Sequence, residues 1–66
     1  MKIILNGEEK DIKDVMSISA LVADVGIESH KVAVERNLEI VPKSEYDSVL
    51  LANNDKIEIV HFIGGG

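Results

Sequence analysis

The residues best placed to do chemistry stand at the carboxyl end of the sequence. Gly64, Gly65 and Gly66 follow the apolar run 57–63 and are the last three residues. Glycine loses the most backbone freedom on ordering, so we expect residues 64–66 to form a flexible tail beyond a folded domain of residues 1–63. Such a tail presents the free α-carboxylate of Gly66 at a reach of about 10 Å. Without Cβ atoms it can enter a narrow channel, and we favour this interpretation over a linker or cloning remnant.

Composition and charge exclude several functional classes. A chain of 66 residues with 45% apolar residues allows one small domain. The absence of cysteine excludes disulfides and nucleophilic thiols and is consistent with the cytoplasm. A net charge of −5 argues against nucleic acid and favours a basic protein surface as partner. No apolar run approaches the ~20 residues of a membrane span, so we expect no membrane association.

Nothing in the side chains predicts an active site or a metal centre. His30 and His61 are the only histidines, and no cysteine accompanies them. Two isolated imidazoles fall short of the ligand sets that hold zinc. The carboxylates, including Glu8 and Glu9, show no spacing that suggests general acid–base catalysis. We therefore expect no catalytic residue and no metal site.

The first residues predict a β-hairpin. Residues 2–5 have the composition of a short strand, and Asn6-Gly7 predicts a type I′ turn because both residue types tolerate a positive φ. A polar strand at about 8–12 would follow. Its charged residues are typical of a sheet edge.

Residues 17–26 predict an amphipathic helix. Ser17 or Ser19 can cap its start, and Gly26 suits the left-handed position that ends a helix. Its polar face is short and nearly free of cations, so we expect burial against the protein's own sheet rather than membrane binding. The apolar positions, at i, i+3, i+4 and i+7, are Ile18, Leu21, Val22 and Val25.

Three further strands complete the predicted order. They cover residues 32–35, 39–41 and 57–63, with Pro42 ending the second of them. A helix packed on one face of a mixed sheet of four to five strands is the economical solution for so short a chain. The first and last strands would lie side by side in the middle. This α+β arrangement is the β-grasp fold.

Alternation along the last strand predicts a docking surface. If Ile57 and Ile59 point into the core, then Glu58, Val60 and Phe62 point to the opposite face. Exposed there, Val60 and Phe62 would offer an apolar patch leading toward the tail. The alternative is that the irregular segment around Tyr46 covers them.

The sequence resembles the ubiquitin-like sulfur carrier proteins, most of all the carriers of thiamin thiazole biosynthesis. The likeness runs almost the full length, and an Ile-Val-Pro segment joined to terminal glycines is its most specific part. Two turns depart from the family pattern by lacking a glycine, at Asn37-Leu38 and at Asn53-Asn54-Asp55. The matching segments are Ile3-Ile4-Leu5-Asn6-Gly7, Ser17-Ile18 with Leu21-Val22, Val32-Ala33-Val34, Asn37 with Glu39-Ile40-Val41-Pro42 and Tyr46, Asp55-Lys56-Ile57-Glu58-Ile59-Val60, and the glycine end.

The resemblance implies a carrier rather than an enzyme. In this family an adenylating, E1-like enzyme activates the terminal carboxylate with ATP, and the resulting thiocarboxylate donates sulfur. The reacting residue would be Gly66. The implied partners are that enzyme, thiazole synthase and a sulfur donor such as a cysteine desulfurase.

The chemistry explains why partners are required. An ionised carboxylate, with a pKa of ~3.5, is a poor electrophile and must be activated before sulfur can replace its oxygen. Charge that develops during adenylation needs Mg²⁺ and basic groups. We expect the partner to use ATP and Mg²⁺ and this chain to bind no cofactor.

Two alternatives stay open from the sequence. One is a sulfur carrier for molybdopterin or another sulfur-containing product. The other is a ubiquitin-like modifier that joins its terminus to lysines of other proteins, or a plain interaction module. The chemical fate of the tail separates these functions.

Overall fold

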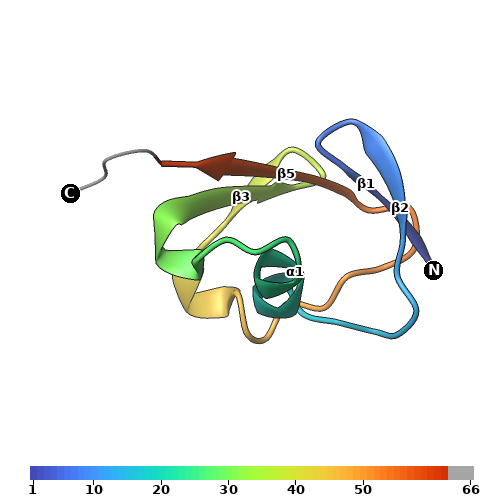
Figure 1. Ribbon diagram of the computed structural model, residues 1–66, viewed down its shortest axis with the longest axis horizontal. Coiled ribbons are helices and arrows are strands. Elements are labelled where there is room, and N and C mark those ends of the chain that lie inside the picture. Colours follow the sequence, from blue (N-terminus) through green and yellow to red (C-terminus); the bar gives the residue numbers. More distant parts are fainter. Residues whose placement is uncertain (63–66) are drawn as a thin grey trace.

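The fold is a mixed sheet with one helix against one face, as a computed structural model of the chain shows for residues 1–62 (Figure 1). The predicted tail, and the predicted domain boundary after residue 63, lie outside these described residues. The elements are β1 (Lys2–Leu5), β2 (Glu8–Asp11), α1 (Ile18–Asp24), η1 (Ser29–Lys31), β3 (Val32–Arg36), β4 (Glu39–Val41), η2 (Lys43–Glu45) and β5 (Lys56–His61).

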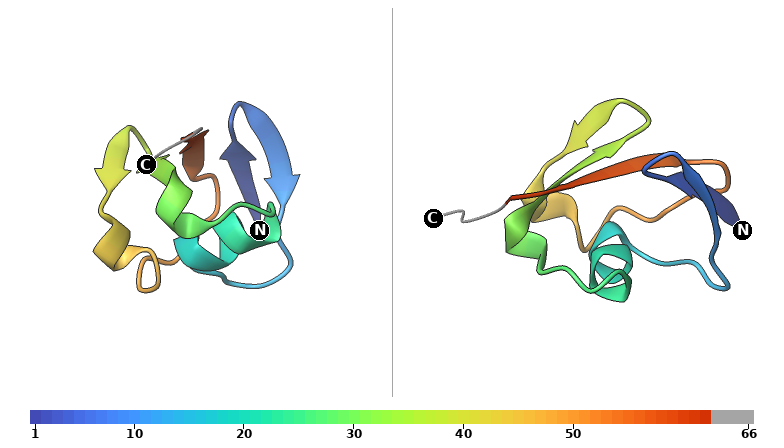
Figure 2. Two further views of the ribbon diagram at one scale, coloured as in Figure 1. Left: turned by 60° about the vertical axis from the view of Figure 1, so that its left-hand side comes forward. Right: turned by 45° about the horizontal axis from the view of Figure 1, so that its top comes forward.

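The five strands have the spatial order β2-β1-β5-β3-β4. β1 and β5 are parallel neighbours, and every other pair is antiparallel. The last strand therefore lies in the centre of the sheet, between the β1–β2 hairpin and the β3–β4 hairpin (Figure 2, left). The polar strand β2 forms one edge. This is the predicted β-grasp arrangement.

Local signals placed the helix correctly. Ser17 is the N-cap of α1, and its hydroxyl accepts a hydrogen bond of 3.0 Å from the backbone N–H of Ala20. Gly26 has φ +85°, so it supplies the left-handed residue that follows the helix. Ile18, Leu21 and Val22 are fully buried against the sheet.

The core lies between α1 and the sheet and draws on most elements. Burial of this apolar set is what stabilises a chain this short, which has no cysteine to form a disulfide. The buried residues are Ile3, Ile12, Ile18, Leu21, Val22, Val32, Val34, Val41, Tyr46, Leu51, Ile57 and Ile59.

Strand ends differ from the predictions by one or two residues. β5 ends at His61 rather than 63, and β3 extends to Arg36 rather than 35. The backbone N–H of Phe62 still donates to the carbonyl of Lys31 at 2.7 Å, so pairing fades gradually at this end. Apolar composition alone cannot say where a strand loses its partner.

Two tight turns join the hairpins. Asn6 and Gly7 have φ +49° and +84°, as a type I′ turn requires. In the β3–β4 turn the corresponding values are +52° at Asn37 and +71° at Leu38. A left-handed conformation costs a residue such as leucine roughly 1–2 kcal/mol, so this turn carries strain that a glycine would relieve.

Candidate functional site

The central strand β5 positions the carboxyl end of the chain. Along its whole length it pairs with β3, from Arg36 opposite Ile57 to Val32 opposite His61. β1 supports only its start, where Leu5 pairs with Ile57. Beyond that point the side-chain amide of Asn6 accepts a hydrogen bond of 2.8 Å from the N–H of Ile59. The start of β5 is therefore paired on both sides, with β1 and β3, whereas its end is paired with β3 alone.

The predicted reacting residue and its two neighbours are not located by the structure. Gly64, Gly65 and Gly66 lie outside residues 1–62. The adenylation site at Gly66 and the tail therefore stay predictions. β5 is the last strand within residues 1–62, and it precedes them in the sequence.

Of the predicted docking residues, Glu58 and Val60 lie on the face of the sheet opposite α1, and Phe62 follows directly after β5. Val60 is 57% exposed and Phe62 45% exposed, and Glu58 is also exposed. Ile57 and Ile59 are buried on the helix side, as the alternation requires. Exposure makes docking possible; docking itself stays a prediction.

The segment around Tyr46 leaves Val60 and Phe62 exposed, although Lys43 of that segment lies over the ring of Phe62. Tyr46 is buried in the core, and its hydroxyl donates a hydrogen bond of 3.4 Å to the carbonyl of Val32. Burial raises the pKa of the Tyr46 hydroxyl, and the backbone of Val34 opposes the rise only in part. Of the two possibilities left open by the sequence, exposure of Val60 and Phe62 is the one observed.

Phe62 is restrained where β5 ends. The ammonium of Lys43 lies 5.9 Å from the centroid of its ring, within the range of a cation–π contact. The same ammonium donates a hydrogen bond of 2.9 Å to the carbonyl of His30. Lys43 thereby links η2, η1 and the end of β5.

The exposed apolar surface is wider than the sequence predicted. Ile40 is 68% exposed and pairs with Glu35, while Val60 pairs with Ala33 on the same face. Leu38, at the β3–β4 turn, is 85% exposed. The sequence did not indicate that Ile40 is exposed. Its strand has only three residues, which is too few to show an alternation of apolar and polar side chains.

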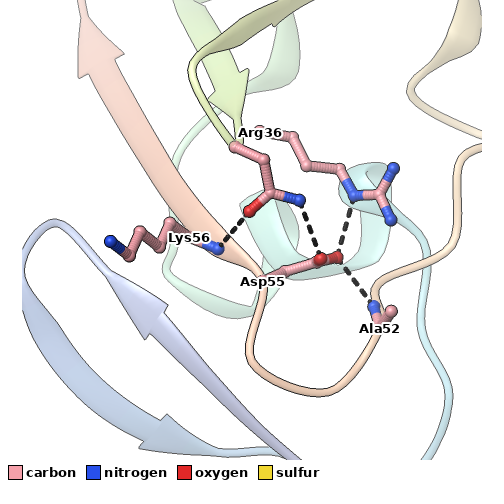
Figure 3. A network of polar contacts seen from close by, with 5 residues as sticks. Arg36, Ala52, Asp55 and Lys56 are labelled. Atoms are coloured by element: carbon pink, nitrogen blue, oxygen red, sulfur yellow. Dashed lines mark hydrogen bonds and ion pairs between the residues drawn. The ribbon is translucent and has the colours of Figure 1, made fainter.

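A buried carboxylate ties the β3–β4 turn to the start of β5 (Figure 3). Asp55 is 5% exposed and accepts hydrogen bonds from Arg36 Nε (2.8 Å), Asn37 Nδ2 (3.0 Å) and the N–H of Ala52 (2.8 Å). Asn37 Oδ1 in turn accepts from the N–H of Lys56 at 2.9 Å. Sequence reasoning missed this cluster, because it joins residues 18 or 19 positions apart.

Electrostatics keep that carboxylate ionised. Burial pushes the pKa of Asp55 upward, but the hydrogen bonds from Arg36, Ala52 and Asn37 outweigh it and leave the pKa below its usual value. The ion pair with Arg36 measures 2.8 Å. The cluster is structural, and it fixes the turn that carries Leu38.

The described residues form neither a metal-binding cluster nor a membrane-spanning helix. Residues 1–62 contain no group of three or more His, Cys, Asp or Glu side chains placed to hold a metal ion. His30 is instead 3.7 Å from the Glu28 carboxylate on the surface. Over the same residues no helix is long and apolar enough to cross a membrane.

Comparison with known proteins identifies the family. Residues 3–66 match the model of the ThiS family. The chain belongs to the ThiS family. It is 49% identical over 63 residues to the sulfur carrier protein ThiS of Bacillus subtilis, covering 94% of this chain and 96% of that one.

Two further relatives extend the comparison. The crystal structure of the thiamine biosynthesis protein ThiS from Geobacter metallireducens superposes with a TM-score of 0.83, at 23% identity and full coverage of both chains, which confirms the fold. A thiazole synthase of Paramagnetospirillum magneticum is 56% identical over 66 residues. This chain spans only 20% of the length of that relative.

Proposed function

We propose that this ThiS-family chain carries sulfur for the thiazole ring of thiamin. The observation that supports it best is the family match, which extends through the glycine residues to position 66. The relative from Bacillus subtilis, similar over nearly its whole length, is named a sulfur carrier. A thiazole synthase that contains a homologous segment favours thiazole as the product.

The reacting group in this proposal is the α-carboxylate of Gly66. A carboxylate oxygen attacks the α-phosphorus of ATP in an E1-like partner, and pyrophosphate leaves. The outer sulfur of a persulfide on a donor such as a cysteine desulfurase then attacks the acyl-adenylate carbon and displaces AMP. A thiol reductant cleaves the S–S bond of the resulting acyl disulfide and returns the donor cysteine as a thiol. The product is a terminal thiocarboxylate, which thiazole synthase consumes. Mg²⁺ and ATP belong to the partner, and the chain acts in the cytoplasm as a carrier and not as an enzyme.

The body of the protein serves this chemistry by presenting the tail. Glu58, Val60 and Phe62 point outward from the strand that leads to Gly64, Gly65 and Gly66. A partner that docks on this face holds the chain beside its own active site. Docking so close to the reacting end would supply orientation, which is a large part of the advantage of a bound reactant.

The test is to load the chain with sulfur and to measure its mass. The protein ending at Gly66 is incubated with its adenylating enzyme, ATP, Mg²⁺, cysteine, a desulfurase and a thiol reductant, and its intact mass is measured. We expect the mass increase of one sulfur-for-oxygen exchange, located in the C-terminal peptide. A ubiquitin-like modifier would instead yield larger isopeptide-linked species. Absence of the thiocarboxylate while the adenylating enzyme loads its other substrates would refute the proposal.

A further inference from the structure

A groove lies on the open face of the sheet, near the turns of the two hairpins. It has a volume of about 420 Å³ and lies over the start of β5. Gly7 and Leu38, from the turns of the two hairpins, both line it. Figure 2 shows the two hairpins on either side of β5. Its other lining residues are Ile4, Glu35, Lys56, Ile57 and Glu58.

Two carboxylates face each other in this groove. Glu35 on β3 and Glu58 on β5 are directly opposite in the antiparallel pairing, so their side chains share one face. Neither forms an ion pair with a lysine or arginine of residues 1–62. Like charges directly opposite destabilise a sheet. The pair therefore lowers the stability of the free protein without an evident structural benefit.

The apolar walls add a second feature that costs stability. Leu38 is held at φ +71° and is 85% exposed, although asparagine or glycine would fit the turn with less strain. Ile4 lies across the groove on β1 and is paired with Lys56. The Asp55 cluster holds the Leu38 turn in place through Asn37. An exposed leucine fixed at a strained position beside unpaired carboxylates is typical of a binding surface.

We propose that the groove receives an arginine side chain of the adenylating enzyme. This inference rests on the proposed function. A guanidinium offers several N–H donors in a planar fork and can bridge Glu35 and Glu58, while its alkyl stem packs between Ile4 and Leu38. A net charge of −5 favours approach of such a basic surface.

The position of the groove suits an enzyme that acts on the end of the chain. Glu58 lines the groove and stands two residues before Val60 on the same outward face of β5, and Phe62 follows just after the strand ends. One docked protein would thus cover the groove and the exposed apolar residues together. A carrier loaded at its tail needs that contact with the enzyme that activates it.

The experiment compares two doubly substituted chains of equal charge. The groove variant is Glu35→Gln with Glu58→Gln, and the control is Glu8→Gln with Asp11→Asn on the edge strand β2. Binding to the cognate adenylating enzyme is measured by calorimetry, and melting temperature by circular dichroism. We expect the groove variant to bind at least about tenfold more weakly than the control, because the guanidinium loses both acceptors. Its melting temperature should rise by a few degrees, roughly, as the like-charge repulsion is removed.

A third variant, Leu38→Asn, tests the apolar wall. Asparagine accepts the left-handed conformation, so we expect a stable protein that binds the enzyme more weakly. Suppose that the wild-type chain is bound and loaded, and that the groove variant and Leu38→Asn bind the enzyme as well as the wild type does. This result would overturn the groove inference and leave the proposed function intact. A wild-type chain that the adenylating enzyme neither binds nor loads would overturn the proposed function and this inference with it.

Discussion

Asp55 shows how one residue can hold the binding face in shape. Its carboxylate links Arg36 and Asn37 of the β3–β4 hairpin to Ala52 in the loop before β5. Among the charged side chains of residues 1–62, it is the one that the fold buries. The Asp55 carboxylate accepts the hydrogen bond from Asn37 Nδ2 and so holds the strained turn in place. Removing it should therefore disturb both stability and the Leu38 turn.

The first prediction concerns Asp55→Asn. The substitution removes the ion pair with Arg36, and an amide cannot accept all three hydrogen bonds, so we expect a loss of about 1–3 kcal/mol in unfolding free energy. Chemical denaturation measures it. Asp47→Asn is the matched control, since Asp47 is exposed. An equal effect in both variants would contradict the role assigned to Asp55.

The second prediction is the pH dependence of that stability. The pKa of Asp55 is lowered in the folded protein, so its contribution is present above the unfolded pKa of ~3.9 and is lost as the pH falls through the folded value. Wild-type stability should decline below about pH 4, and Asp55→Asn should show a shallower decline. Denaturation curves across the acid range check this. Parallel declines would show that other carboxylates are responsible.

The third prediction concerns Gly66. In Gly66→Val a branched side chain stands beside the carboxylate and narrows access to the activated carbonyl. We expect thiocarboxylate formation to be lost while the melting temperature stays that of the wild type. Intact mass and thermal melting measure the two properties. Normal sulfur loading of Gly66→Val would show that the terminal position tolerates a Cβ and that the channel argument is wrong.

At the scale of elements, local features were predictable and cross-strand ones were not. The Asn6-Gly7 turn and the cap at Ser17 depend on residues within four positions of each other, and both were read correctly. The facing pair Glu35 and Glu58 depends on the register between two strands separated by a helical turn, a short strand and a long loop. No local pattern encodes that register. The groove between the hairpins was missed for the same reason.

For β5, the sequence predicted which side chains face inward and which face outward, but it did not predict the residues at which the strand begins and ends. Its outward residues follow from a period of two, which any strand imposes. Where it stops depends on how far β3 extends beside it, and that length was not encoded in the composition of 57–63.

The fourth prediction tests the outward face of β5. Phe62→Ala removes a half-exposed ring at the end of the strand, so the melting temperature should change little while binding to the adenylating enzyme weakens several-fold. Val15→Ala is a suitable control, because Val15 is also exposed but precedes α1. Calorimetric titration compares the two. Equal affinities for the two variants would remove Phe62 from the docking surface.

At the scale of the whole molecule, one face of the sheet forms the core and the other is exposed. α1 and the core residues occupy one face of the sheet, and the other carries exposed Leu38, Ile40, Val60 and Phe62. The sequence predicted this division, because a single helix can cover only one face. It did not predict the size of the apolar surface, which requires the register of β4 against β3.

The fifth prediction follows from the net charge of the molecule. Twelve acidic residues against seven lysines and arginines give an electrostatic attraction to a basic partner that acts before contact. The association rate with the adenylating enzyme should therefore fall as salt is added, roughly tenfold once the Debye length drops well below ~10 Å. The dissociation rate should change less, because apolar contacts at Val60 and Phe62 are insensitive to screening. Stopped-flow mixing over a salt series measures both rates. An association rate that does not change with salt would mean that complementary charge plays no part in the encounter, and would weaken the case for a basic partner surface.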